Sequence, residues 1–264
     1  MPKSIKKVGL CLGGGGALGV AHIGFIDELI NSGIPIDMIA GTSIGAFVGG
    51  LFAAGMSPAE MKEHLMKFRR FKVVDLNAFS FAFARDGLVV GRRIVRYLNR
   101  FIKDKTFNDL IIPFKAIACD IVTGKEEIIC KGNLTEAIRC STSVPGIFKP
   151  VKKGKKILVD GGIVDNLPVS TVREMGADIV VTVDLHSAYT PDGDLNRFMP
   201  IGFSAISIMF KTMAELMPDK GDVYVAVRQP DVSAERFTRA EINKSLEYGK
   251  LAAREVADKI KRLM

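Results

Sequence analysis

One serine in this chain has the setting of a nucleophile. Ser43 lies in the pentapeptide Gly41-Thr42-Ser43-Ile44-Gly45, which follows a short apolar run and precedes a segment of small residues. The G-x-S-x-G pattern is typical of a strand, a sharp turn that carries the serine, and a helix. Gly41 and Gly45 suit so tight a reversal because a Cβ atom at either position would crowd the neighbouring backbone. The alternative is an ordinary strand–helix connection in which Ser43 only caps the helix.

A glycine-rich loop precedes the serine by one strand. Residues 13–19 read Gly-Gly-Gly-Gly-Ala-Leu-Gly and contain the dinucleotide fingerprint G-x-G-x-x-G. That interpretation needs an acidic residue at the C-terminal end of the next strand, whereas Asp37 stands at its beginning. In a second interpretation, the ends of two parallel strands place the N–H groups of residues 13–16 beside Ser43, where they stabilise an oxyanion during acyl transfer. We favour the second interpretation because it explains both motifs.

An activated serine also needs a proton acceptor. Asp160 closes a predicted buried strand, so we expect it to lie on the carboxyl edge of the sheet, as Ser43 does. Gly161 and Gly162 follow it and leave its carboxylate sterically open. We therefore interpret Asp160 as a base that acts directly on the serine; the alternative is an Asp-Gly turn without chemistry. His186 follows a predicted strand and would complete a serine, aspartate and histidine order like that of α/β-hydrolases. His22 is expected to be packed or hydrogen-bonded rather than catalytic.

Local patterns predict the elements that position these groups. Strands are predicted over residues 6–12, 114–122, 125–130, 156–159 and 178–185, with a further strand leading into Gly41. Helices are predicted over residues 20–31, 44–54, 92–103, 135–140, 168–175 and 238–264, with another beginning at Pro58. The first strand, helix and second strand form a β–α–β unit, which indicates a parallel sheet. Residues 71–91 are expected to be rich in loops.

The composition indicates an ordinary globular chain. Of its 264 residues, 48% are hydrophobic and 25% are charged, and no repeat or linker divides it, so we expect one domain over residues 1–264. The basic N-terminus lacks the apolar length of a secretory signal, and no apolar run reaches the roughly 18 residues of a membrane span. The four cysteines show no C-x-x-C spacing, which favours buried free thiols in a reducing compartment. We therefore expect a cytoplasmic protein.

Positive charge is concentrated in one segment. Residues 62–105 contain twelve lysines and arginines against four acidic residues, and aromatic side chains are interleaved with them. Nucleic acid, an anionic membrane surface and plain solvent are all compatible partners for such a segment.

Three motifs in a fixed order resemble those of bacterial patatin-like phospholipases. They are the glycine loop 13–19, the serine motif 41–45 and Asp160-Gly161-Gly162, accompanied by the stretches 141–151 and 166–168. The resemblance covers residues 7 to about 184 and implies a dyad in which Ser43 is the nucleophile and Asp160 the general base. The backbone N–H groups of Gly14, Gly15 and Gly16 would form the oxyanion hole, and His186 would have no obligatory role.

The same resemblance implies the fold and the substrate class. The fold would be a three-layer α/β/α sandwich around a mostly parallel sheet, and the reaction would use neither a metal nor an organic cofactor. The substrate would be a phospholipid or a related acyl ester. A thioesterase, a neutral-lipid esterase, a non-catalytic lipid-binding homologue and an oxidoreductase remain alternatives. Leu18 stands where many bacterial relatives carry a basic residue, which leaves its effect on substrate choice open.

A lipid substrate gives the basic segment a more specific interpretation. Residues 62–105 are expected to contact an anionic membrane peripherally, so the cytoplasmic location would include the inner membrane surface. No nucleic acid partner is expected, because no recognised binding module is present. Phe79, Phe81 and Phe83, and also residues 198–217, are candidates for a lid or an acyl pocket, with burial in the core as the alternative. The oligomeric state is left open.

Overall fold

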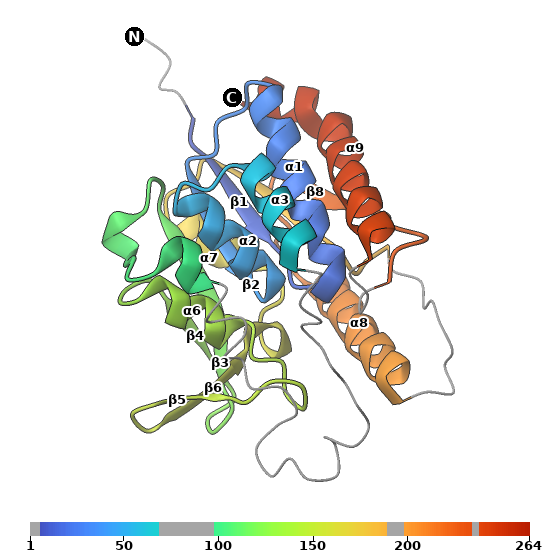
Figure 1. Cartoon of the computed structure of the whole chain (residues 1–264). Coiled ribbons are helices and arrows are strands. Elements are labelled where there is room, and N and C mark those ends of the chain that lie inside the picture. The colour runs from blue at the N-terminus through green and yellow to red at the C-terminus, as the bar shows by residue number, and fades with distance from the viewer. Residues whose placement is uncertain (1–5, 69–97, 189–197, 234–237) are drawn as a thin grey trace.

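The computed structural model describes residues 6–68, 98–188, 198–233 and 238–264 (Figure 1). Within these residues, eight strands form one sheet in the order β5-β6-β3-β2-β1-β7-β8, with β4 paired to β3. The strands are β1 (Val8–Leu12), β2 (Met38–Thr42), β3 (Phe114–Asp120), β4 (Lys125–Ile129), β5 (Val151–Lys153), β6 (Lys156–Asp160), β7 (Ile179–Asp184) and β8 (Val223–Ala226). The α-helices are α1 (Val20–Asn31), α2 (Ile44–Ala53), α3 (Pro58–Phe68), α6 (Leu134–Ser141), α7 (Val169–Glu174), α8 (Phe198–Leu216) and α9 (Arg239–Leu263).

Helices cover both faces of the sheet. Leu10 of β1 and Val181 of β7 point into the larger apolar cluster, which also contains residues of α1, α2 and α9. Their chain neighbours Cys11 and Val180 point into a second cluster with residues of α7 and α8. Successive strand residues face opposite sides of a sheet, so the strands lie between two helical layers. The predicted three-layer α/β/α sandwich is confirmed.

The sheet is parallel in its centre and antiparallel at one side. Strands β3, β2, β1, β7 and β8 pair in parallel, whereas β4 and β6 pair with β3 in antiparallel fashion, as does β5 with β6. The β3–β4 hairpin confirms the two strands predicted on either side of Thr123 and Gly124. Strand β5 has three residues and β8 has four, and neither was predicted, because such short edge strands carry little periodic signal.

Strand β6 runs in the opposite direction to β2 and β3, so it approaches the serine turn from the other end. Thr42, the last residue of β2, pairs with Ile117 of β3, and Asp160, the last residue of β6, pairs with the next residue, Ala118. Because β4 occupies the other edge of β3 there, β2 and β6 lie end to end on one edge. We expected Asp160 to share the carboxyl edge of parallel strands. Instead its antiparallel strand meets the serine strand head-on.

Some predicted features lie outside the described residues. These include the loop-rich stretch 71–91 with Phe79, Phe81 and Phe83, and half of the helix predicted over residues 92–103. Of its described residues, 98–103, the first five are helical. All four cysteines are free; Cys130 is exposed, which corrects the expectation of buried thiols, and the other three are buried. None of the described helices is both long and apolar enough to span a bilayer.

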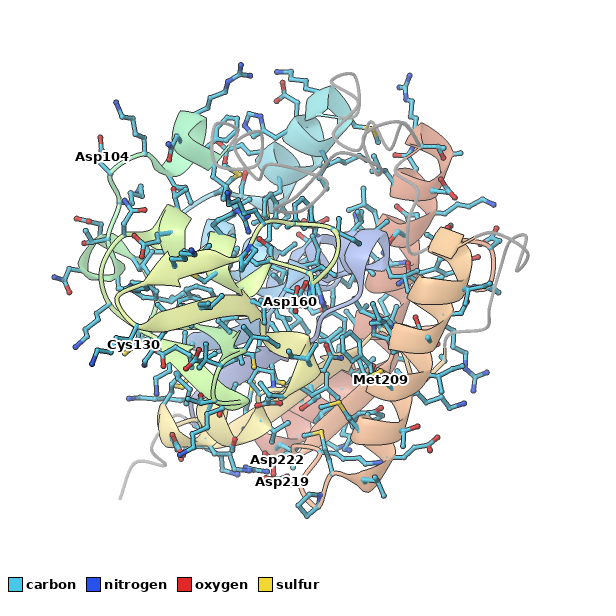
Figure 2. All side chains as sticks on the ribbon, turned by 90° about the horizontal axis from the view of Figure 1, so that it is seen from below. Asp104, Cys130, Asp160, Met209, Asp219 and Asp222 are labelled. Atoms are coloured by element: carbon cyan, nitrogen blue, oxygen red, sulfur yellow. The ribbon has the colours of Figure 1, made fainter. Side chains whose placement is uncertain are left out.

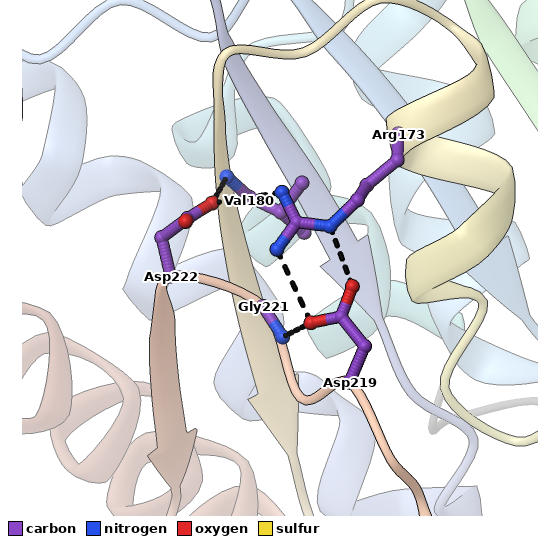
Figure 3. Close-up of polar contacts among 5 residues, drawn as sticks. All are labelled: Arg173, Val180, Asp219, Gly221 and Asp222. Carbon is purple, nitrogen blue, oxygen red and sulfur yellow. Dashed lines mark hydrogen bonds and ion pairs between the residues drawn. The ribbon is translucent and has the colours of Figure 1, made fainter.

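One arginine fixes the edge strand β8 to the rest of the sheet (Figure 3). Arg173 at the end of α7 donates to both carboxylate oxygens of Asp219, at 2.5 Å from Nε and 3.1 Å from Nη2, and to Asp222 at 3.2 Å. Asp222 also accepts a hydrogen bond from the N–H of Val180 in β7 at 2.8 Å. The guanidinium therefore joins a helix, a loop and the last two strands.

The C-terminal helix packs along α1, as Figure 1 shows in red and blue. A capping box between Thr238 and Glu241 begins the helix. A Cβ atom at Gly24 would lie 1.9 Å from the carbonyl oxygen of Leu246, and one at Gly249 would lie 1.9 Å from that of Ala21. The two glycines therefore allow the helix backbones to touch.

We expect Gly249→Ala to lower the free energy of unfolding by about 1–3 kcal/mol, because the added methyl group forces α1 and α9 apart. Gly202→Ala is the matched control, since Gly202 also lies within a helix and, outside its own helix backbone, no atom of the described residues is within 4 Å of its Cβ position. Chemical denaturation of both variants measures the difference. Equal stability of the two variants would contradict the close helix contact.

Candidate active site

Ser43 stands on a strained turn between β2 and α2. Its backbone has φ 55° and ψ −122°, a conformation that residues other than glycine rarely adopt. A Cβ atom at Gly45 would lie 2.0 Å from the carbonyl oxygen of Leu12, and one at Gly41 would lie 2.5 Å from the carbonyl carbon of Gly45. Both glycines are therefore required by close backbone contact. Strain at one non-glycine residue is a recurrent feature of functional sites.

The Ser43 side chain does not cap α2. It makes no capping hydrogen bond, although Ser43 is at the N-cap position, and its Oγ instead donates to Asp160 Oδ2 at 2.5 Å. Ser43 is 8% exposed and Asp160 is 4% exposed. The structure thus excludes the interpretation of Ser43 as a simple helix cap and brings the two predicted residues into direct contact.

The Asp160 carboxylate is buried but hydrogen-bonded through both oxygens. Oδ2 accepts from Ser43, and Oδ1 accepts from the N–H of Gly162 at 2.9 Å. Burial raises the pKa of Asp160 to about 6, although these two hydrogen bonds act in the opposite direction. At neutral pH the carboxylate is therefore mostly ionised and a stronger base than an exposed aspartate. Figure 2 looks at the lower side of the molecule and shows Asp160 near the centre of that face.

The C-terminal end of α6 and the residues that follow it hold both residues in place. The N–H of Ser43 donates to Ser141 Oγ at 2.9 Å, and the N–H of Asp160 donates to the carbonyl oxygen of Ser143 at 3.0 Å. The guanidinium of Arg139, itself 8% exposed, donates to Ser143 Oγ. Sequence reasoning noted this stretch only as part of the family resemblance, and its serines carry no pattern that would have revealed the contacts.

The glycine loop lies against the serine turn. Gly13 continues β1, and its N–H donates to the carbonyl oxygen of Val183 at 3.1 Å. A Cβ atom at Gly14 would lie 3.2 Å from the Cβ atom of Ser43. Gly16 then turns the chain with φ 55° and begins a 3-10 helix (Gly16–Gly19). The structure therefore brings the loop, the serine and the aspartate together as the sequence predicted.

The N–H groups of this loop differ in their partners. That of Gly14 donates to Asn166 Oδ1 at 3.1 Å. Among the described residues, none accepts a hydrogen bond from the N–H of Gly15 or Gly16. Sequence reasoning gave Asn166 no role, and its presence in the shared stretch after Asp160 was the one available signal.

His186 does not lie between the serine and the aspartate. A triad would place a histidine there, whereas Ser43 binds Asp160 directly. The His186 ring packs edge-on against Phe210, with ring centroids 4.9 Å apart. Burial lowers the pKa of His186 to about 4, against the opposing effects of Asp184 and a backbone hydrogen bond at Gly14. The ring is therefore neutral at pH 7 and borders the glycine loop.

His22 is packed and hydrogen-bonded, as expected from the sequence. Its Nε2 lies 2.8 Å from the carbonyl oxygen of Gly13. Burial lowers the pKa of His22 to about 4, so the neutral ring donates from Nε2 to this carbonyl and fixes the start of the loop. As for metals, no cluster of three or more His, Cys, Asp or Glu side chains suited to an ion occurs in the described part of the chain.

Known sequences resemble this chain over most of its length. The Lysophospholipase nte1 of Emericella nidulans is 34% identical over 191 residues, which are 71% of this chain and 12% of that protein. The human Patatin-like phospholipase domain-containing protein 6 is 32% identical over 69% of this chain and 14% of its own length. An uncharacterized NTE family protein of Mycobacterium bovis is 29% identical over 94% of this chain and 46% of its own length. The chain thus spans less than half of each relative.

Solved structures share the fold of this chain, and a family model shows its family. VipD from Legionella pneumophila superposes with a TM-score of 0.64 at 14% identity, covering 96% of this chain and 67% of VipD. ExoU in the ExoU-SpcU complex of Pseudomonas aeruginosa gives 0.53 at 17% identity, covering 97% of this chain and 52% of ExoU. At these identities the likeness concerns the fold alone. A family model described as Patatin-like phospholipase matches residues 10–173, and the chain therefore belongs to the patatin-like phospholipase family.

Proposed function

We propose that this chain is a serine hydrolase that cleaves the acyl ester bonds of phospholipids or lysophospholipids through a Ser43–Asp160 dyad. The observation that carries this proposal is the 2.5 Å hydrogen bond from Ser43 Oγ to Asp160 Oδ2 in a buried site on a strained turn. The family supplies the substrate class, since the similar proteins are named as lysophospholipases and phospholipases.

The proposed acylation step begins with proton transfer. Asp160 accepts the Ser43 proton as Oγ attacks the carbonyl carbon of the ester. The carbonyl oxygen becomes an oxyanion, which backbone N–H groups of the glycine loop stabilise; that of Gly14, also predicted for this role, is bound to Asn166 in this structure. Gly15 and Gly16 contribute the N–H groups that lack an acceptor among the described residues. Collapse of the intermediate breaks the ester C–O bond, and the departing alcohol takes the proton from Asp160.

Deacylation repeats these roles with water as the nucleophile. Asp160 accepts a proton from water, whose oxygen attacks the acyl carbon bound to Ser43. The second tetrahedral intermediate collapses with release of the fatty acid, and the proton returns to Ser43 Oγ. A carboxylate with a pKa near 6 suits both steps, because it is ionised at neutral pH and still accepts a proton in the transition state.

Membrane contact is a separate part of the proposal. The lipid substrate and the net charge of +8 support peripheral binding of residues 62–105 to an anionic surface. Of this segment the structure describes 62–68 and 98–105, in which Lys62, Lys67 and Lys103 are exposed. Such contact would place the protein peripherally on a membrane surface.

We expect a fluorophosphonate to label Ser43 in the wild type and not in Ser43→Ala, and hydrolysis of lysophosphatidylcholine to be lost in that variant. Asp160→Asn should lower kcat/KM by roughly 10² to 10⁴, the range for loss of a general base. Asp120→Asn is the matched control, because Asp120 is also a buried strand-end aspartate but binds Thr123 and the N–H of Ile157. Phospholipid, acyl-CoA and triacylglycerol assays define the subtype. A wild-type rate in Asp160→Asn would rule out the dyad.

The pH dependence of kcat/KM provides an independent test of Asp160. The pKa is raised from 3.8 to about 6, so the base is protonated and inactive below that pH. With a neutral ester substrate, kcat/KM should therefore rise about tenfold per pH unit below pH 6 and level off above pH 7. A profile that is flat between pH 4.5 and 7 would show that no group with this pKa takes the proton.

Binding to lipid vesicles tests the membrane contact. We expect binding to anionic vesicles to exceed binding to neutral vesicles, to weaken with added salt, and to fall in the triple variant Arg92/Arg93/Arg96→Ala, since the attraction is electrostatic. Cosedimentation measures the bound fraction. Equal binding to both vesicle types would reject the electrostatic contact and leave the hydrolase proposal intact.

A further inference from the structure

A buried amide adjoins both the glycine loop and the serine turn. Asn166 is 3% exposed, and its Oδ1 accepts the hydrogen bond from the N–H of Gly14 at 3.1 Å. A Cβ atom built on Gly14 would lie 2.6 Å from Asn166 Oδ1 and 3.2 Å from the Cβ atom of Ser43. The amide and the nucleophile therefore flank the same point of the loop backbone.

The other end of this amide has no partner. Asn166 Nδ2 is fully buried and finds no acceptor among the described residues. An amide NH₂ group has two N–H donors, and leaving a buried donor unsatisfied costs about 1–3 kcal/mol. Natural structures rarely tolerate such a group without a reason, and a functional site is one of the recognised reasons.

The surroundings hold this amide in one orientation. Because Oδ1 serves the N–H of Gly14, the NH₂ group is directed away from that N–H. The preceding residue, Asp165, accepts a hydrogen bond from Thr42 Oγ1 on its carbonyl oxygen at 2.9 Å. The following residue, Leu167, is 2% exposed in the apolar cluster beneath the loop. The backbone around Asn166 is thus tied to the residue that precedes Ser43.

We propose that Asn166 is a further catalytic residue, whose Nδ2 donates a hydrogen bond to the oxyanion while its Oδ1 holds Gly14. This inference rests on the proposed hydrolase function. It also explains why the N–H of Gly14 can donate to Asn166 Oδ1 and not to the oxyanion. Asn166 Nδ2 supplies a donor in its place, beside the N–H groups of Gly15 and Gly16. A neutral, preoriented donor stabilises negative charge as that charge develops, and one such donor contributes roughly 10²–10³ to kcat.

Asn166→Asp separates the two roles of the amide. Aspartate has the same shape and keeps an acceptor for Gly14, but it has no N–H donor when ionised. We expect kcat for lysophosphatidylcholine to fall by roughly 10² or more with KM changed less than about threefold. Asn133→Asp is the control for the same chemical change, because Asn133 Oδ1 also accepts one backbone N–H, from Glu136 at 3.0 Å, at the exposed N-cap of α6, where aspartate caps as well as asparagine does. That control should retain the wild-type rate.

Several outcomes would overturn the inference. If Asn166→Asp retains kcat while Asn166→Ala loses it, the residue only anchors the loop. A carboxylate at position 166 also raises the pKa of Asp160. If the rate of Asn166→Asp recovers at pH 9, where Asp160 is ionised again, that pKa shift alone explains the loss and the Nδ2 donor is unnecessary. Thermal unfolding checks that each variant is folded. If Asn166→Asp does not fold, Asn166→Ala decides: a kcat within threefold of the wild type rejects the inference.

Ser43→Ala is assayed in parallel. If it retains hydrolysis, the proposed function fails and the inference fails with it. If hydrolysis depends on Ser43 but the Asn166 variants keep the wild-type kcat, the inference about Asn166 fails alone.

Discussion

The hydrogen bond between Ser43 and Asp160 is the interaction on which the arrangement of this molecule depends. It exists because β2 and β6 end at adjacent positions along one edge of β3, so that Asp160 at the end of β6 meets Ser43, the residue after β2. The contact requires a buried carboxylate with a raised pKa and a serine at positive φ, both of which are unfavourable in isolation. The surrounding hydrogen bonds, from Gly162 and to Ser141 and Ser143, hold these two groups in place.

Close backbone approach is the second constraint. The serine turn touches the end of β1, where a side chain at Gly45 would strike the Leu12 carbonyl, and the glycine loop touches the serine through Gly14. The two segments, residues 12–16 and 41–45, can approach this closely only because Gly14 and Gly45 lack Cβ atoms at the points of contact. The groups left to act on a substrate are one serine, one carboxylate, backbone N–H groups and a buried amide, all of them neutral at rest apart from Asp160.

Membership of the patatin-like phospholipase family agrees with this arrangement. The matched region, residues 10–173, contains the glycine loop, the serine turn, Asp160 and Asn166. The elements beyond it, β7, β8, α8 and α9, complete the sheet and its covering layers. Arg173 ties β8 in place, and α9 packs along α1 through paired glycines, so these later elements support the fold that carries the site.

The sequence by itself determined the local features: the β–α–β unit, the two glycine motifs, the long C-terminal helix, and Ser43 and Asp160 as candidates. Each depends on apolar periodicity or on glycine spacing within a few residues. Only the tertiary structure decided how they meet. Ser43 binds Asp160 across 117 residues and Gly14 binds Asn166 across 152. The first of these contacts follows from the antiparallel register of β6 on β3. Register between distant strands is set by packing of the whole sheet, which no local pattern contains.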